Sequence, residues 1–150
     1  MSYNVRFANA RRGEEAVLAH AQDIASVFSR INPDFAGLQE VVTADFRQYV
    51  RPDPFVAELE RLLPKYGWIA PVGAALLTQS NPILYRRERF MPVRQGLEWF
   101  SPAPQTPDST GWGNYLPRYI VWATFYDASL HRHVTVANVH LDHLSRAMNR

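Results

Sequence analysis

The sequence predicts one α/β domain, and three observations support that prediction. The chain opens with an alternating strand pattern at residues 3–8 and an amphipathic helix pattern at residues 14–31. A strand pattern at 35–42 and a helix pattern at 54–63 repeat this order. The rest of the chain is rich in β-branched and aromatic runs separated by turn residues. With 150 residues, of which 47% are hydrophobic, the chain supplies one core.

Local signals set the bounds of the first four elements. In the first strand, apolar side chains alternate with the polar Asn4 and Arg6, as in a strand with one buried face. The first helix repeats apolar residues at spacings of three and four, and it ends before Pro33 because proline disfavours a helical residue before it. The second strand is mostly apolar and carries Glu40 near its end. The second helix has Pro54 in its first turn and another proline just past its end.

Five further strands are expected in the second part of the chain, at residues 68–72, 82–86, 90–97, 119–126 and 133–141. Between them, residues 101–117 hold four of the eleven prolines and two of the seven glycines, which predicts a long ordered loop. A helix is expected to begin near residue 143.

Composition excludes several classes of protein. Cysteine is absent, so the chain has no disulfide framework and no thiolate zinc site. With 16 Lys and Arg against 14 Asp and Glu, the net charge of +2 is too small to indicate nucleic-acid binding by itself. No apolar run approaches the roughly 18 residues that span a bilayer, and the first residues do not read as a secretion signal. We therefore expect a cytoplasmic protein.

The densest polar cluster follows a β-branched strand near the end of the chain, in the run Asn-Val-His-Leu-Asp-His at 138–143. Strand alternation places Asn138, His140 and Asp142 on one face, so an amide, an imidazole and a carboxylate project together. Such a group suits general acid–base catalysis or metal binding. The alternative is that His140 satisfies a core hydrogen bond while Asp142 caps the following helix.

Two further polar residues lie at predicted strand positions. Glu40, near the end of a buried strand, must be neutral, paired with an arginine or bound to a cation. Asn4 is either a site residue or an ordinary exposed amide. Three arginines, Arg86, Arg87 and Arg89, surround a predicted turn and are expected to be solvated.

The same residues also resemble a rival site motif. The spacing of His140 and His143 resembles part of the zinc signature of metallo-β-lactamases, although Asn138 stands where that signature has its first histidine. A serine hydrolase is disfavoured because no Gly-x-Ser-x-Gly turn occurs. Glycine-rich nucleotide-binding loops are absent as well.

An ordered set of segments is more specific than any single motif; these are residues 3–7, 33–41, 81–90, 117–118 and 138–143. Their order and spacing resemble the endonuclease/exonuclease/phosphatase superfamily, within it the bacterial metal-dependent hydrolases, over nearly all of the chain. The resemblance implies a deoxyribonuclease I-like fold, a two-sheet β-sandwich flanked by helices. It also implies hydrolysis of a phosphoester, most often a phosphodiester.

The resemblance assigns roles to residues of this chain. Glu40 and Asn4 would bind Mg2+ or Mn2+, and hard cations of this kind prefer carboxylate and amide oxygens. His140 would contact the scissile phosphate, oriented by Asn138 and Asp142.

Three more residues receive weaker assignments from the resemblance. Arg118 would contact phosphate, and Trp112 would stack on the substrate or pack against prolines of its own loop. Gln79 stands where family members carry a glutamate that hydrogen-bonds the catalytic histidine.

Family domains continue for roughly another hundred residues, with a Gly-Asp-x-Asn segment and a late Asp-His pair. This chain contains neither, so residues 1–150 are expected to form a partial domain, and both an active and an inactive chain are open. The substrate would be a phosphate ester, with nucleic acid, lipid headgroup and small ester all open. A homo-oligomer or second chain covering the missing half, and a noncatalytic assembly module, are further possibilities.

Overall fold

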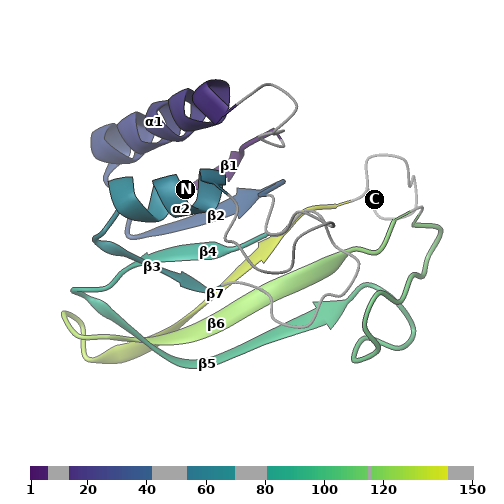
Figure 1. Ribbon diagram of the computed structural model, residues 1–150. Coiled ribbons are helices and arrows are strands. Elements are labelled where there is room, and N and C mark those ends of the chain that lie inside the picture. Colours follow the sequence, from purple (N-terminus) through teal and green to yellow (C-terminus); the bar gives the residue numbers. More distant parts are fainter. Residues whose placement is uncertain (7–13, 42–53, 70–80, 115, 142–150) are drawn as a thin grey trace.

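The computed structural model describes residues 1–6, 14–41, 54–69, 81–114 and 116–141 (Figure 1). Its elements in chain order are β1 (Ser2–Asn4), α1 (Glu14–Ile31), β2 (Phe35–Gln39), α2 (Pro54–Leu62), β3 (Tyr66–Ile69), β4 (Ile83–Arg86), β5 (Phe90–Trp99), β6 (Tyr119–Asp127) and β7 (Arg132–Val139). The predicted order of strands and helices is confirmed, and the loop expected after β5 separates β5 from β6. The helix expected near residue 143 lies outside the described residues.

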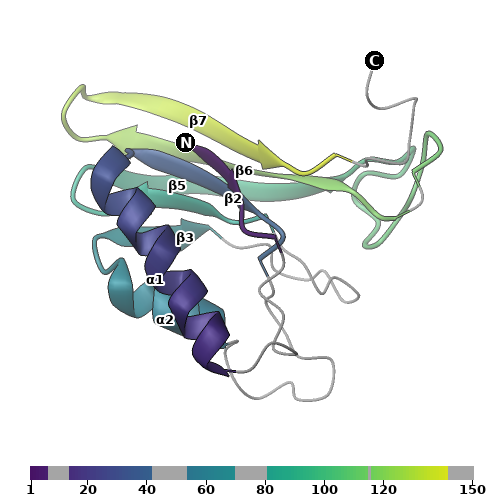
Figure 2. The ribbon, with the colours of Figure 1, turned by 90° about the horizontal axis from the view of Figure 1, so that it is seen from above.

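The strands form two sheets that stack on one another. The first has the order β1-β2-β4-β3 and the second the order β5-β6-β7. Helices α1 and α2 cover the outer face of the first sheet, and the second sheet lies on its other side (Figures 1 and 2). The fold is therefore a two-sheet sandwich flanked by helices, as predicted.

Helix α1 has the predicted bounds, and its apolar stripe explains why. Val17, Ala21, Ile24 and Phe28 recur at helical spacing and are all buried. The helix ends where Asn32 adopts a left-handed conformation (φ 49°) and its backbone N–H donates to the Phe28 carbonyl at 2.7 Å. In the described part of the chain, no helix is long and apolar enough to cross a membrane.

A hydrophobic core fills the space between the two sheets. Alternate residues of β6 face it, and Phe125 is fully buried at its centre. The Phe125 ring contacts the rings of Phe35 and Tyr85 at centroid distances of 5.0 and 4.9 Å, and that of Phe90 at 6.4 Å. These rings join strands of both sheets, so the packing of the sandwich depends on them.

The three strands that lead into the candidate site end earlier than the sequence predicts. The first strand ends at Asn4 rather than near residue 8. The second ends at Gln39, because Glu40 takes a left-handed conformation (φ 60°) that no strand continues. The last ends at Val139, which leaves His140 just beyond it. The candidate site residues therefore lie at or just past strand ends.

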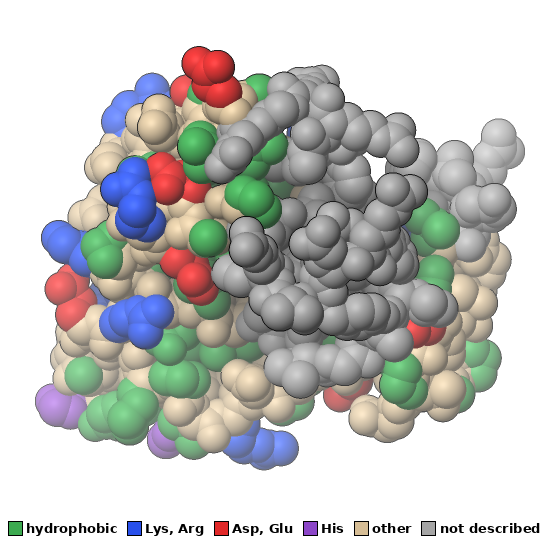
Figure 3. Space-filling model, in the orientation of Figure 1, with side chains coloured by type: hydrophobic (Ala, Val, Ile, Leu, Met, Phe, Trp, Pro, Cys, Tyr) green, Lys and Arg blue, Asp and Glu red, His purple; other side chains and the backbone are tan. Residues whose placement is uncertain are grey.

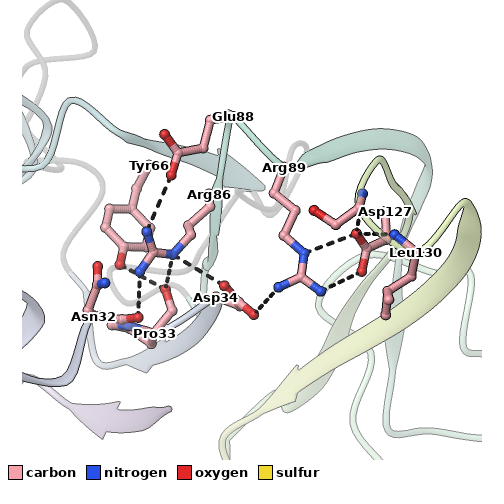
Figure 4. A network of polar contacts seen from close by, with 10 residues as sticks. Asn32, Pro33, Asp34, Tyr66, Arg86, Glu88, Arg89, Asp127 and Leu130 are labelled. Carbon is pink, nitrogen blue, oxygen red and sulfur yellow. Dashed lines mark hydrogen bonds and ion pairs between the residues drawn. The ribbon is translucent and has the colours of Figure 1, made fainter.

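Two of the three arginines expected to be solvated are instead held in polar networks (Figure 4). The Arg86 side chain is only 13% exposed and donates to the carbonyl of Asn32 at 2.6 Å. Arg89 donates to both carboxylate oxygens of Asp127 at 3.0 and 2.8 Å and to Asp34 at 2.8 Å. The prediction was wrong for these residues because their acidic partners are distant in the sequence. Arg89 thereby links the start of β2 to the end of β6.

Acid should weaken this link between the sheets. The hydrogen bonds from Arg89 lower the pKa of Asp127 from 3.8 to about 2, with help from the backbone N–H groups of Ser129 and Leu130. Because the folded state disfavours protonation of Asp127, the link stabilises the protein fully above about pH 4 and is lost as the pH falls towards 2.

Urea unfolding between pH 6 and pH 2 measures this effect. We expect Asp127→Asn to be less stable than the wild type at pH 6 and to lose less stability than the wild type between pH 4 and pH 2. Equal acid sensitivity of the two proteins would show that the Arg89 link contributes nothing.

Candidate active site at the strand ends

Four predicted site residues meet at one end of the sandwich. Asn4 ends β1, Glu40 follows β2, His140 follows β7 and Arg118 precedes β6. Asn4 Nδ2 donates to Glu40 Oε1 at 2.8 Å, and His140 Nε2 lies 3.7 Å from that same oxygen. Arg118 Nη1 lies 3.4 Å from His140 Nδ1. Residues from both sheets therefore form one continuous polar chain.

The parallel pairing of β1 and β2 brings the first two residues together. Asn4 is paired with Gln39, and the next residue, Val5, donates its N–H to the Gln39 carbonyl at 3.0 Å. Ends of parallel strands lie at the same edge of a sheet, where open α/β folds bind ligands. His20 of α1 donates through Nε2 to the Val5 carbonyl at 2.8 Å. The chain following Asn4 is thus fixed on both sides.

Backbone geometry aims the Asn4 and Glu40 side chains. The Arg6 N–H donates to Asn4 Oδ1 at 2.7 Å, so the Asn4 amide nitrogen is the atom that faces Glu40. Both Arg6 and Glu40 have a left-handed backbone, with φ of 55° and 60°. Non-glycine residues rarely adopt this conformation, and where they do it often belongs to a functional site.

The contact with Arg118 fixes the proton on the His140 ring. A guanidinium nitrogen can only donate a hydrogen bond, so His140 Nδ1 must accept and the ring hydrogen must lie on Nε2. That nitrogen is the one directed at Glu40. Arg118 is itself 9% exposed, and its Nε is buried without a hydrogen-bond partner among the described residues.

The donor set suits a hard divalent cation. Glu40 supplies a carboxylate, and Mg2+ is commonly bound by one or two carboxylates with water and substrate phosphate completing its shell. Asn4 directs its amide nitrogen at Glu40 and its Oδ1 at the Arg6 N–H, so it would supply an oxygen only once its amide has turned. Within the described ranges, there is no group of three or more His, Cys, Asp or Glu side chains that could hold a metal ion. The Glu40 carboxylate therefore fits a cation that keeps most of its waters, with Asn4 as a further ligand once its amide has turned.

Asn138 lies between the sheets rather than in the polar chain. It is 6% exposed, its Nδ2 donates to the carbonyls of Leu38 and Pro82 at 2.7 and 3.0 Å, and its Oδ1 accepts from Gln39. This amide is fully engaged, so Asn138 is not available as a metal ligand. The alternative zinc site was expected to use His140 and His143. His143 lies outside the described residues.

Three other predictions have different outcomes. Asp142 and Gln79 lie outside the described residues. Trp112 has a left-handed backbone (φ 53°) and is 54% exposed, so its ring does not pack fully against its own loop. Gln39 and His20 were missed by the sequence reasoning, although an amide inside an otherwise apolar strand was a signal for Gln39.

Neither a protein-family model nor a curated protein matches the chain. Solved structures do match. The endonuclease/exonuclease/phosphatase from Bacteroides vulgatus has a TM-score of 0.80 at 20% identity, over 96% of this chain and 52% of that chain.

Two further structures extend the comparison. The mannosyl-6-phosphatase of Bacteroides thetaiotaomicron VPI-5482 has a TM-score of 0.79 at 28% identity, over 97% of this chain and 52% of that chain. D. rerio TDP2, complexed with a single-strand DNA product, has a TM-score of 0.66 at 16% identity, over 97% of this chain and 46% of that chain. This chain therefore has the fold of the endonuclease/exonuclease/phosphatase family, as its motifs predicted, and spans about half the length of these solved structures.

Proposed function

We propose that the chain of contacts from Asn4 to Arg118 is the cation- and phosphate-binding part of a metal-dependent phosphoester hydrolase. One observation carries the proposal: Glu40 Oε1 lies 2.8 Å from the Asn4 amide nitrogen and 3.7 Å from the ring nitrogen of His140. A carboxylate for the cation and a hydrogen-bond donor for phosphate thus lie side by side. Among the matched structures, a mannosyl-6-phosphatase and a protein complexed with single-strand DNA product support the same chemistry.

Glu40 and Asn4 would hold Mg2+ or Mn2+ through their side-chain oxygens. When bound, the cation would polarise a phosphoryl oxygen and offset the negative charge that develops on it. Asn4 would turn its amide for this role, because its Oδ1 accepts from Arg6 in the structure described above. The Glu40 carboxylate would keep its place at the end of β2.

His140 would donate its Nε2 hydrogen to a phosphate oxygen beside Glu40. Arg118 would assist from the other side of the ring, because its hydrogen bond to Nδ1 keeps the donor hydrogen on Nε2. The guanidinium also brings positive charge close to the phosphate position. The group that activates the attacking water would come from outside these four residues.

The substrate class follows from what the matched proteins have in common. A sugar phosphatase and a protein bound to a DNA product both handle phosphate esters, while the rest of their ligands differ. Over the described part of the face in Figure 3, acidic and basic side chains are interspersed, and the net charge is +2. Long nucleic acids are bound by basic surfaces that displace many counterions. We therefore favour a small phosphate ester or a nucleic-acid end over a long duplex.

Hydrolysis of two chromogenic esters tests the proposal. Bis(p-nitrophenyl) phosphate and p-nitrophenyl phosphate would be assayed with Mn2+, with Mg2+ and with chelator. We expect turnover that requires the cation, and a loss of about 10²–10³-fold in kcat for His140→Ala, the size typical of removing one transition-state donor.

His133→Ala is the matched control, because His133 is an exposed histidine of β7, the strand that precedes His140. It should keep the wild-type rate. The absence of turnover, turnover in chelator, or an unchanged rate in His140→Ala would contradict the proposed function.

A further inference from the structure

The buried amide pair Gln39–Asn138 crosses between the sheets directly behind the candidate site. Gln39 is 7% exposed, and its Nε2 donates to Asn138 Oδ1 at 2.8 Å. The same nitrogen lies 3.2 Å from Ser2 Oγ and 3.2 Å from the Gly37 carbonyl. Buried amides of this kind are costly unless their hydrogen bonds are made. Here the bonds join the last residue of β2 to β7 in the other sheet.

The pair lies next to the residues that would do the chemistry. Gln39 immediately precedes Glu40, and Asn138 comes two residues before His140. Strands β2 and β7 belong to different sheets, so no backbone ladder sets the spacing between their ends. The Gln39–Asn138 hydrogen bond constrains this spacing instead. It lies one residue from Glu40 and two residues from His140.

Close packing around the pair limits how Asn138 can sit. A Cβ atom added at Gly37 would lie 2.6 Å from Asn138 Oδ1, so only glycine lets the amide approach the β2 backbone this closely. Asn138 Nδ2 is held by the Leu38 carbonyl at 2.7 Å. The Asn138 amide is therefore fixed in position as well as paired.

We infer that Gln39 is a positioning residue, which sets the distance between Glu40 and His140 through its hydrogen bond to Asn138. The inference rests on the proposed function for the role of that distance, since a cation and a phosphate must fit between the two side chains. Gln39 itself would contact neither the cation nor the phosphate. Its effect reaches the site through the two strand ends that it ties together.

The experiment compares Gln39→Met with Tyr66→Phe. Methionine keeps the length of the side chain and removes the donor. The Tyr66 variant removes another buried hydrogen bond, from the hydroxyl to the Pro33 carbonyl at 2.8 Å, near the opposite end of β2. Both variants should unfold at a lower temperature than the wild type, so stability alone does not separate positioning from a purely structural role.

The separating measurement is the 15N spectrum of the histidine rings at fixed pH, in protein that is folded by circular dichroism. We expect Gln39→Met to shift the His140 ring resonances while those of His131 and His133, at the other end of β7, stay in place. Tyr66→Phe should move none of the three. Unshifted His140 resonances in Gln39→Met would overturn the inference.

Hydrolysis adds a second readout. Gln39→Met should lower kcat/KM by about 10- to 100-fold, the range seen when residues that orient site ligands are removed, and Tyr66→Phe by less than about twofold. Equal rates in the two variants would overturn the inference. A wild type without metal-dependent turnover would instead refute the proposed function, and the spectra would still decide the positioning role.

If Gln39→Met does not fold, Ser2→Ala gives a milder test, because it removes one acceptor of the Gln39 amide at an exposed position. A smaller shift of the same His140 resonances would then be expected. No shift would overturn the inference.

Discussion

Replacing Glu40 by glutamine is expected to lower metal-dependent hydrolysis by about 10³-fold. A bound cation contributes several kcal/mol to stabilising a phosphoryl transition state, and each 1.4 kcal/mol is a factor of ten in rate. Glutamine has nearly the same shape and keeps an oxygen that can accept from Asn4 Nδ2. The substitution therefore removes the charge that holds the cation and leaves the local packing in place.

Rates with saturating Mn2+ for the wild type and Glu40→Gln measure this effect. Glu98→Gln is the matched control, because Glu98 is an exposed glutamate on β5. Thermal unfolding of all three proteins checks that the fold is intact. A Glu40→Gln protein that hydrolyses esters at the rate of the Glu98 variant would remove Glu40 from the site.

Phe125→Ala should lower the free energy of unfolding by about 3–5 kcal/mol, the usual cost of removing a buried aromatic side chain. Phe125 is fully buried, and its ring contacts those of Phe35, Tyr85 and Phe90 between the two sheets. Alanine would leave a cavity that these rigid rings cannot close. The loss should be large because the cavity lies where the sheets are joined.

Chemical denaturation of Phe125→Ala, Phe125→Leu and Tyr126→Ala tests this interpretation. Leucine fills part of the space and should cost less than alanine. Tyr126 follows directly in β6 and faces the other side of the sheet, half-buried, so its removal should cost less than the loss of Phe125. Equal losses for Phe125→Ala and Tyr126→Ala would show that the inter-sheet core does not govern stability.

Long periodic elements were predicted well because their signal is local. Helix α1 has the bounds read from the sequence, since 18 residues of amphipathic periodicity and a following Asn-Pro fix both of its ends. Strand ends were predicted less well. The turn at Glu40 depends on a left-handed backbone that no residue type in this run signals.

Contacts between distant segments could not be read from local patterns. Arg86 and Arg89 read as solvated because Asp34 and Asp127 are far from them in the sequence. Motif resemblance overcame this limit for Asn4, Glu40 and His140, which the structure brings together. It did not reveal Gln39, because the amide acts only once the two sheets are stacked.

Titration of the chain with Mn2+, followed by the electron paramagnetic resonance signal of the free ion, measures whether the Asn4–Glu40–His140 cluster is a cation site. We expect the wild type and Glu98→Gln to bind one ion with equal affinity. Glu40→Gln should bind it about 100-fold more weakly, because the charged ligand is lost. Identical binding by the wild type and Glu40→Gln, or no binding by the wild type, would contradict a cation site at the ends of β1 and β2.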